Sequence, residues 1–336
     1  MCCSNAASMA EAISPNAHAF WTTKAGEGEL RSETLSPPGP ADLLVETLAS
    51  GISRGTEMLV FQGVVPESQH DRMRAPFQVG DFSFPLKYGY ASVGRVIEGA
   101  ADLIGQRVFC LHPHQDRYVV PADAVSPLPD AVSTERAVLA ANMETALNAL
   151  WDAPPRIGDR IAVIGCGVVG ALIASLAKDI PGVQLEMIDI NPEKAAIAEA
   201  LDLPFTAPDQ ASGEVDLVIH ASGRQGGLVT ALELAGFEAT ILEVSWYGDR
   251  PVTLPLGEHF HSRRLKLISS QVGMVAAAMR GRRRYVDRMA QALRLLADPR
   301  FDVLLAPPRP FADLPAVMSD LASGDKEIMC QVIAYR

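Results

Sequence analysis

The sequence predicts an α/β protein with two parts, a β-barrel-type domain and a doubly wound parallel sheet. Three observations predict this fold class. The N-terminal third consists of short apolar runs broken by Pro and Gly, the middle alternates β-branched with helix-forming runs, and the chain ends on a strand-like run. The chain has 336 residues, of which 48% are hydrophobic. This is enough for two hydrophobic cores.

The N-terminal part is expected to be rich in β-strands. Residues 1–17 are small and polar and are expected to form a flexible tail. Beyond this tail, turns that are rich in Pro and Gly separate runs with the residue types of strands. The strand-like runs are 42–48, 91–98, 107–111 and 116–120.

Helical periodicity begins in residues 133–151, where Ser133 is a candidate N-cap. Strand-like and helix-forming runs then alternate, which predicts a parallel sheet. The strand-like runs are 161–164, 185–190, 215–220, 238–244 and 265–270. A basic helix is expected at about 285–297 and a last strand within 327–335. One helix with short β pieces does not bury a core alone, so this segment is expected to return to the N-terminal part.

The turn after the first strand of the parallel sheet has a dinucleotide-binding pattern, Gly-Cys-Gly-Val-Val-Gly. Gly165 permits the tight turn, Gly167 lets the backbone approach a pyrophosphate, and Gly170 lets the helix pack close to the strand. The following helix directs its N-terminal amides, which include those of Val168 and Val169, at the phosphates. The pattern therefore predicts a Rossmann-type sheet with a bound dinucleotide.

The residues at the ends of the later strands predict which dinucleotide binds and where. Asp189 lies near the end of the second strand, where an acidic residue is expected to hold the ribose 2′-hydroxyl of NAD and to repel the 2′-phosphate of NADP. The predicted cofactor is therefore NAD. Its nicotinamide half is expected at the carboxyl ends of the remaining strands. The residues there are Ser222, Gly223, Ser245 and Gln271.

Composition narrows the classes of partner and location. The formal net charge is −11, and such a surface repels polyphosphate, so no nucleic acid is expected as a partner. The arginines of residues 280–284 are interpreted as a solvated helix face or a subunit contact. No apolar run reaches the roughly 18 residues needed to cross a membrane, and residues 1–12 lack the features of a signal peptide. The five cysteines show neither metal-type spacing nor an even number, so a reducing, cytoplasmic location is expected.

A β-rich domain, an inserted Rossmann domain and a C-terminal return resemble the medium-chain dehydrogenase/reductase superfamily, whose catalytic domain is GroES-like. The resemblance covers nearly the whole chain. Besides the glycine turn, it rests on three segments, 49–57, 87–97 and 137–146. It implies a homodimer joined through the Rossmann sheets. The implied domains are 18–141 with 273–336 for the catalytic domain and 142–272 for the cofactor domain.

The resemblance also implies where a metal would bind in zinc members of the superfamily, which use cysteine, histidine and glutamate ligands. At those positions this sequence has Ser53, Tyr90 and Ala91, and the third-ligand position falls near Ala141 or Asn142. None of these side chains would hold zinc tightly. We therefore predict that the protein has no metal site.

Without a metal, a side chain has to polarise or protonate the substrate oxygen. Tyr90 is the best-placed candidate because a phenol can donate a hydrogen bond and pass a proton; the alternative is a barrel tyrosine that packs its ring. Thr56 falls near the superfamily's proton-relay hydroxyl, or else closes a turn. Glu144 interrupts an apolar helical run. It could orient a partner such as Arg54, act as an acid/base group of raised pKa, or face solvent.

Two further features near the expected cleft have more than one interpretation. His112 and His114 follow a strand end and are interpreted as surface-loop histidines rather than as residues that line the cleft. The long loop 64–85 carries several aromatic residues. It is expected to form a lid over a bulky, partly apolar substrate, or to be pinned by its aromatics or used in dimerisation.

Together, these features imply a zinc-independent, NAD(H)-dependent oxidoreductase that interconverts an alcohol and a carbonyl on a small organic molecule, with a side-chain proton relay. Segments 50–57 and 89–94 are similar to the branch that contains bacteriochlorophyllide hydroxyethyl dehydrogenases. One alternative is an NAD(P)H-dependent quinone or enoyl reductase, which Asp189 disfavours. Another is a non-catalytic cofactor-sensing protein, which the loss of all metal ligands suggests.

Overall fold

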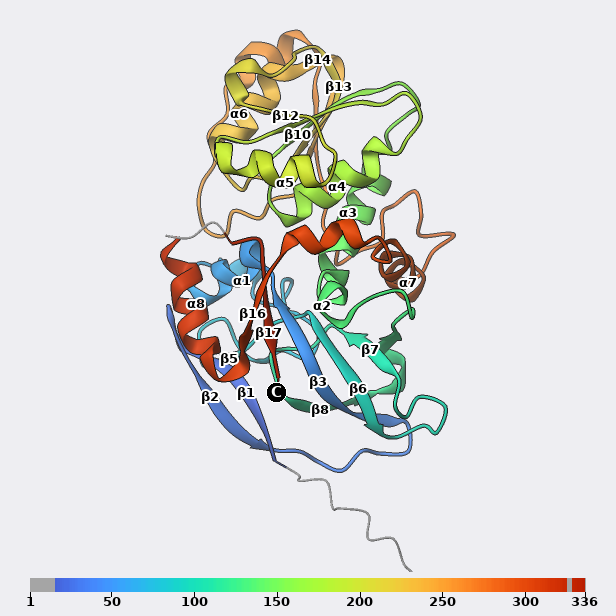
Figure 1. Cartoon of the computed structure of the whole chain (residues 1–336). Coiled ribbons are helices and arrows are strands. Elements are labelled where there is room, and N and C mark those ends of the chain that lie inside the picture. Colours follow the sequence, from blue (N-terminus) through green and yellow to red (C-terminus); the bar gives the residue numbers. More distant parts are fainter. Residues whose placement is uncertain (1–15, 325–327, 336) are drawn as a thin grey trace, which may run out of the picture.

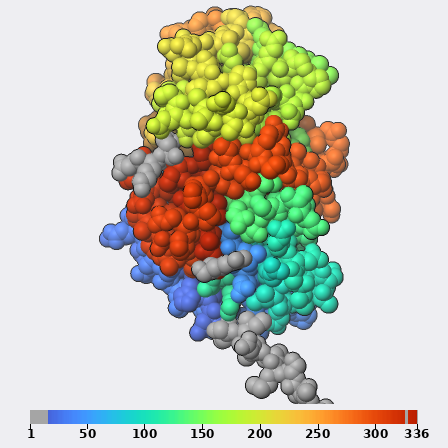
Figure 2. Space-filling model, viewed as in Figure 1, coloured from blue at the N-terminus to red at the C-terminus, as the bar shows by residue number. Residues whose placement is uncertain are grey.

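The structure is a computed structural model that describes residues 16–324 and 328–335. Residues 1–15 of the expected tail and Glu327 of the expected last strand lie outside the described residues. Residues 16 and 17 of the expected tail instead begin a strand, in which Ala17 is buried. Figure 1 shows two stacked parts, a β-rich part below and a sheet with helices above. In Figure 2 the C-terminal segment, in red, covers the face between the N-terminal residues in blue and the sheet residues in yellow. The predicted fold class is confirmed.

The upper part contains a six-stranded sheet in the order β12-β11-β10-β13-β14-β15, and all neighbouring strands run parallel. The strand order reverses between β10 and β13. In sheets of this kind, ligands bind beside the carboxyl ends of the strands at that point. The strands are β10 (Arg160–Ile164), β11 (Gln184–Ile188), β12 (Phe205–Thr206), β13 (Val215–His220), β14 (Ala235–Glu243) and β15 (Lys266–Ser269).

Helices cover both faces of this sheet. Ile161 and Val163 of β10 pack in one buried cluster with residues of α4, whereas Ala162 and Ile164 pack in another with residues of α6. A strand that is covered on both faces has to be apolar on both, which explains the continuous apolar run. The helices are α4 (Val168–Lys178), α5 (Ala195–Ala200) and α6 (Gln225–Leu234).

The lower part contains two sheets. A four-stranded sheet has the order β2-β1-β5-β4, and a larger sheet has the order β16-β17-β3-β6-β7-β9, with β8 also paired to β3. The C-terminal strand β17 thus lies antiparallel to β3 from the N-terminal part. The strands are β1 (Asn16–Lys24), β2 (Glu27–Thr34), β3 (Asp42–Ile52), β4 (Val79–Gly80), β5 (Leu86–Lys87), β6 (Ser92–Glu98), β7 (Arg107–Cys110), β8 (Arg117–Pro121), β9 (Val125–Pro127), β16 (Leu305–Pro310) and β17 (Cys330–Ala334).

The helix expected from Ser133 onward is divided into α2 (Thr134–Ala137) and α3 (Ala140–Asp152). Ser133 caps α2 through its side-chain oxygen, as predicted. The break contains neither Gly nor Pro. It places Val138 directly over Gly51 of β3, where an added Cβ would lie only 2.9 Å from Val138. Packing against a distant strand therefore interrupts a sequence that is locally helical.

Three more helices complete the elements that concern the site. They are α1 (Arg54–Phe61), α7 (Tyr285–Leu295), which is the predicted basic helix, and α8 (Leu314–Ser323). None of the helices in the described residues combines the length and apolar character that crossing a membrane requires.

Candidate active site

A cleft of about 1920 Å³ is lined by residues of both parts. It brings together every residue that the sequence predicted for the site except Gly170, which lies behind the glycine turn. From the β-rich part and α3 come Thr56, Tyr90 and Glu144, and from the parallel sheet come Gly165, Gly167, Val168, Val169, Asp189, Ser222, Gly223, Ser245 and Gln271.

The three glycines of the turn meet different surroundings. Gly165 has a φ of +105°, which favours glycine, and an added Cβ there would lie 2.7 Å from the backbone nitrogen of Ser222. A Cβ on Gly170 would overlap the carbonyl oxygen of Gly165. A Cβ on Gly167 would meet nothing within 4 Å. The backbone at Gly167 is therefore open to a ligand, next to the N-terminus of α4 that begins at Val168.

Asp189 is held in place by the turn that it faces. One carboxylate oxygen accepts a hydrogen bond from the backbone nitrogen of Cys166 at 2.7 Å, and the other accepts from Asn191 at 2.9 Å. Each oxygen keeps a free lone-pair direction, and the residue lines the cleft. An acceptor for ribose hydroxyls is thus fixed beside the glycine turn.

Lys194 is a residue of this side of the cleft that the sequence analysis missed. It lines the cleft, and its side chain is buried with the amine 3.3 Å from the Met329 sulfur. Burial raises the pKa of the nearby Cys166 thiol to about 11; Asp189 also raises it, and Lys194 lowers it. Lys194 could have been found as the lysine that ends the short helical turn directly after Asp189.

The residues expected at the nicotinamide end are tied together by a buried histidine. The ring nitrogens of His220 lie 2.8 Å from a Glu243 carboxylate oxygen and 2.6 Å from the Ser222 hydroxyl. The other Glu243 oxygen accepts from the Ser245 backbone at 2.7 Å. Burial opposes ionisation of Glu243, but the hydrogen bonds, first among them that with His220, lower its pKa overall. His220 and Glu243 were not predicted from the sequence, although each is a polar residue that ends an apolar strand.

On the opposite wall of the cleft, Tyr90 meets the two hydroxyl residues of the segment that enters α1. Its hydroxyl lies near the Ser53 and Thr56 hydroxyls, which act to lower its pKa, and its ring packs edge-on against Tyr88 at 5.9 Å. Burial raises the pKa of the Tyr90 phenol well above its usual value, and the charge of Glu57 raises it further. Tyr90 is therefore a protonated hydrogen-bond donor at neutral pH.

The positions at which the resemblance implies zinc ligands do lie together. The Asn142 amide nitrogen donates to the Ser53 hydroxyl at 3.4 Å, and Ser53 contacts Tyr90. Zinc in proteins is held by thiolate, imidazole and carboxylate groups. An alcohol, a phenol and an amide do not fit it, and residues 16–324 and 328–335 contain no group of three or more His, Cys, Asp or Glu that could hold a metal.

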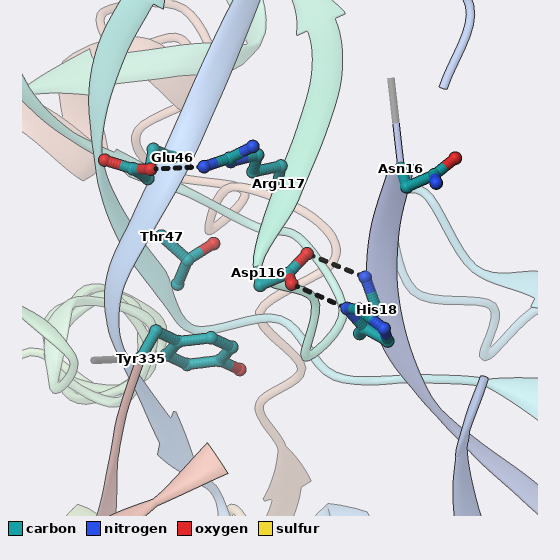
Figure 3. A pocket seen from close by; sticks show the side chains of 7 residues that line it. All are labelled: Asn16, His18, Glu46, Thr47, Asp116, Arg117 and Tyr335. Carbon is teal, nitrogen blue, oxygen red and sulfur yellow. Dashed lines mark hydrogen bonds and ion pairs between the residues drawn. The ribbon is translucent and has the colours of Figure 1, made fainter. Parts of the chain in front are cut away.

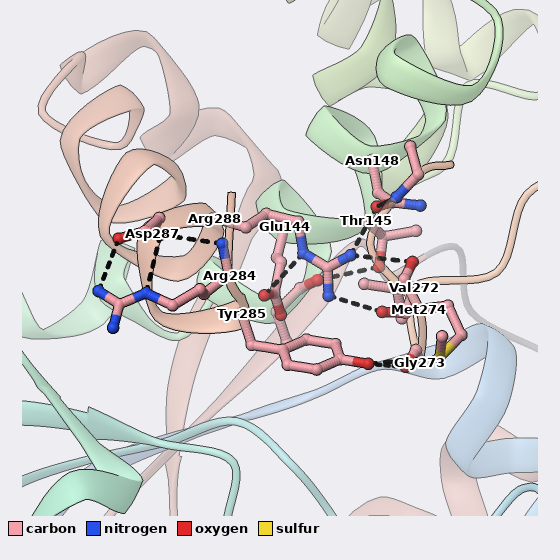
Figure 4. Close-up of polar contacts among 12 residues, drawn as sticks. Glu144, Thr145, Asn148, Val272, Gly273, Met274, Arg284, Tyr285, Asp287 and Arg288 are labelled. Atoms are coloured by element: carbon pink, nitrogen blue, oxygen red, sulfur yellow. Dashed lines mark hydrogen bonds and ion pairs between the residues drawn. The ribbon is translucent and has the colours of Figure 1, made fainter. Parts of the chain in front are cut away.

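Glu144 does not face solvent and is not paired with Arg54, so both of those alternatives are wrong. Figure 4 shows its carboxylate beside Arg288 of α7, whose Nε lies 3.0 Å from Glu144 Oε1. Both side chains are buried. Arg288 also donates to Val272 O at 2.6 Å and Met274 O at 3.2 Å. The pair therefore fastens the loop after β15 to α3. Burial raises the pKa of Glu144 even though Arg288 opposes the shift.

The interpretation of His112 and His114 as surface-loop residues is also wrong. Both are buried, and neither lines the cleft. His112 stacks on Tyr118 with ring centres 3.8 Å apart, and burial lowers its pKa to about 3. His114 is enclosed because the Phe20 backbone nitrogen of β1 donates to its carbonyl at 2.9 Å. The loop is covered by a strand that is distant in sequence.

The loop 64–85 forms part of the cleft wall and is also pinned by its aromatic residues. Gln69, Met73 and Pro76 line the cleft. Phe82 is buried with its ring 6.0 Å from that of Tyr88. The loop is therefore pinned near Phe82 and borders the cleft at residues 64, 69 and 72–76.

Known proteins resemble this chain in sequence and in fold. No family model matches the chain. Over 240 residues, the chain is 30% identical to 2-desacetyl-2-hydroxyethyl bacteriochlorophyllide A dehydrogenase of Cereibacter sphaeroides. This alignment covers 62% of this chain and 70% of the relative. Acetophenone reductase of Geotrichum candidum, solved with NAD, has a similar structure, with a TM-score of 0.75 and 16% sequence identity. The match covers 96% of this chain and 98% of the reductase.

A Sinorhizobium meliloti protein solved with NADP also has a similar structure, with a TM-score of 0.74 at 17% identity. The match covers 95% of this chain and 99% of the Sinorhizobium meliloti chain. The structural likenesses concern the fold, whereas the sequence relative also shows the family. The chain belongs to the medium-chain dehydrogenase/reductase superfamily of oxidoreductases.

Proposed function

We propose that the protein is a zinc-independent, NAD(H)-dependent oxidoreductase that interconverts an alcohol and a carbonyl group on a small organic substrate. One observation carries the proposal. A single cleft has an open glycine turn with Asp189 on one wall and Tyr90 with two partner hydroxyls on the other. A dinucleotide and a substrate oxygen can therefore meet in it.

The parallel-sheet wall would hold the cofactor. The amides after Gly167 would bind the pyrophosphate, Asp189 would accept from the adenosine ribose, and Ser222 and Ser245 would border the nicotinamide. When bound, the nicotinamide would accept or donate the hydride. Related structures contain either NAD or NADP, so the preference for NAD rests on Asp189, whose charge would repel a 2′-phosphate.

Tyr90 would act on the substrate oxygen. Its raised pKa keeps the phenol protonated, so it can donate a hydrogen bond to a carbonyl. In reduction the phenol proton passes to the oxygen as negative charge develops there, and in oxidation Tyr90 receives a proton back. Ser53 and Thr56 would be the neighbouring hydroxyls that orient it. The residues at the zinc positions fit no zinc, so this polarising role falls to Tyr90.

The cleft favours a bulky substrate. Its volume of about 1920 Å³ exceeds the roughly 300–1,000 Å³ of common small-molecule pockets, which leaves space beside a dinucleotide. The Cereibacter sphaeroides relative is by name a dehydrogenase of a hydroxyethyl bacteriochlorophyllide. A secondary alcohol of the 1-hydroxyethyl type on a large, partly apolar ring system is therefore the first substrate class to test.

The test is a turnover screen that includes hydroxyethyl- and acetyl-substituted ring systems, simple alcohols and ketones, and enones, with NAD(H) and NADP(H) in parallel. The proposal expects NAD-linked interconversion of an alcohol and a ketone. Reduction of enones or quinones with a clear NADPH preference would replace it by a quinone or enoyl reductase. NADH binding without turnover of any substrate would favour a cofactor-sensing protein.

We infer that the chain forms a homodimer through β15. This strand is the edge of the parallel sheet, and all of its residues, Leu267 and Ile268 included, are exposed. An exposed apolar edge strand is a template for pairing with another strand. Light scattering should give the mass of two chains, and Ile268→Pro should give the mass of one; a monomeric wild type would contradict the inference.

A further inference from the structure

Two titratable side chains of the β-rich part are buried away from the cleft surface. Glu57 is 2% exposed and His114 is 1% exposed, and the Glu57 Oε2 and His114 Nε2 atoms lie 2.9 Å apart. Neither lines the cleft. Burying such a pair costs several kcal/mol per ion if both are charged. The pair therefore calls for a role beyond packing.

The pair continues into a chain of hydrogen bonds. His114 Nδ1 lies 2.7 Å from the Ser50 hydroxyl, which in turn lies 2.9 Å from the Tyr335 hydroxyl. These distances are all within hydrogen-bond range. The donors can all point the same way: Tyr335 donates to Ser50, Ser50 to His114, and the Nε2–H of His114 to Glu57.

The outer end of this chain opens on a second cavity. Tyr335 lines a polar cavity of about 420 Å³ together with His18 and Asp116. Figure 3 shows these side chains around the cavity, with His18 hydrogen-bonded to Asp116. His18 is exposed, so solvent reaches this end. Tyr335 follows β17, whose end lies in the lower half of Figure 1, away from the parallel sheet.

The inner end lies next to the reactive group of the cleft. Glu57 belongs to the first turn of α1, and its Oε1 accepts from the Ser53 backbone nitrogen at 2.7 Å. The Ser53 side chain is a partner of the Tyr90 hydroxyl, and the charge of Glu57 acts on the Tyr90 phenol. When cofactor and substrate fill the cleft, bulk water is displaced from the side of Tyr90 that faces the cleft. A second route for protons then becomes useful.

We propose that Tyr335, Ser50, His114 and Glu57 form a proton relay that joins the second cavity to Tyr90. The relay rests on the proposed function. In reduction, the Tyr90 O–H bond breaks as its proton forms the O–H bond of the alcohol. The Nε2 proton of His114 then moves to the Glu57 carboxylate, and Glu57 passes a proton to Tyr90 through one water molecule held between them, which returns Glu57 to its charged form.

The remaining steps restore His114 with a single solvent proton. The Ser50 proton moves to His114 Nδ1, the Tyr335 proton to Ser50, and a proton from water in the second cavity to Tyr335. One proton enters and one leaves in the product, so the balance closes. Rotation of the hydroxyls and tautomer exchange of His114 reset the relay, and oxidation runs it outward.

The first test needs no substrate. Exchange of the His114 ring proton with solvent is measured by NMR on histidine-labelled protein, with the signal assigned by comparison with His114→Gln. Tyr335→Phe should slow this exchange by roughly tenfold or more, because it removes the group that hands protons inward. Tyr118→Phe is the matched control, since Tyr118 is also buried and its hydroxyl lies 3.1 Å from Ser92. Equal exchange in the two variants would overturn the relay.

The second test uses turnover. Tyr335→Phe and Ser50→Ala should each lower kcat while leaving KM and the NADH affinity unchanged, and a small proton carrier such as imidazole should restore part of the rate. Tyr118→Phe should leave all of these unchanged. A fall in kcat that imidazole does not restore would contradict the relay. If the wild type turns over no alcohol or ketone, the proposed function fails, and the exchange measurement still decides the relay.

Discussion

At the scale of single residues, Gly167 and Gly170 lie in the same turn but lack a side chain for different reasons. Gly170 packs against the backbone of Gly165, so its lack of a side chain serves the fold. Gly167 has φ −85° and ψ −179°, an extended conformation that any residue adopts, and empty space beside it. The fold therefore does not require glycine here, whereas the proposed dinucleotide, which would approach the backbone, does.

A pair of alanine variants tests this distinction. Gly167→Ala should leave the free energy of unfolding unchanged or raise it by up to about 1 kcal/mol, because alanine restricts the unfolded chain. NADH affinity should nevertheless fall roughly tenfold or more, which corresponds to about 1.4 kcal/mol. Gly170→Ala should lose about 1–3 kcal/mol of stability through overpacking. Urea unfolding and NADH fluorescence titration measure both, and unchanged NADH binding in Gly167→Ala would move the cofactor elsewhere.

Tyr90 is the residue on which the proposed chemistry depends. Tyr90→Phe should lower kcat by about a hundredfold or more, since positioned proton transfer contributes at least that much. NADH affinity should not change, because the cofactor lies on the other wall. Tyr88→Phe, which keeps its ring against Tyr90, is the control. Steady-state kinetics on a substrate from the screen gives the answer, and equal kcat for Tyr90→Phe and wild type would remove Tyr90 from the mechanism.

At the scale of elements, a feature could be predicted from the sequence when neighbouring residues determine it, and not when distant residues do. The strands of the parallel sheet and the glycine turn could be predicted because each is encoded by a short run of residues. The partner of Glu144 could not, since Arg288 is 144 positions away in sequence. Likewise, the burial of His114 depends on β1, and the break between α2 and α3 depends on Gly51. Long-range packing decided each of these outcomes.

The pair of Glu144 and Arg288 links α3, α7 and the loop after β15. Arg288→Met should cost about 3–5 kcal/mol, because it leaves a buried carboxylate without its partner. NADH affinity should fall as well, since the carbonyls of Val272 and Met274 lose their donor. Adding Glu144→Leu should recover part of the stability. Arg284→Ala, which breaks only an exposed pair with Asp287, should change little. Stability is measured by urea unfolding. Equal losses of unfolding free energy in Arg284→Ala and Arg288→Met would refute the structural role of the pair of Glu144 and Arg288.

At the scale of the whole molecule, the chain brings three distant regions to one cleft. The β-rich part supplies Tyr90, the parallel sheet supplies Asp189, and α7 supplies Arg288. The second cavity lies on the β-rich part alone, next to the end of β17. Ligands can therefore fill the cleft while the far side of the same β-rich part remains in contact with solvent, which is the arrangement that the proposed proton relay requires.

The zinc content of the whole protein tests whether Tyr90, and not a metal ion, polarises the substrate. We expect well below one zinc per chain by elemental analysis of purified protein, and kcat and Tm that a chelator leaves unchanged, because Ser53, Tyr90 and Asn142 offer no thiolate, imidazole or carboxylate. Cys2 and Cys3 lie outside the described residues, so the measurement is repeated on a Cys2→Ser, Cys3→Ser variant. Zinc that disappears in this variant would belong to those cysteines. Near one tightly bound zinc per chain that persists in it, with activity lost on chelation, would show that a metal and not Tyr90 polarises the substrate.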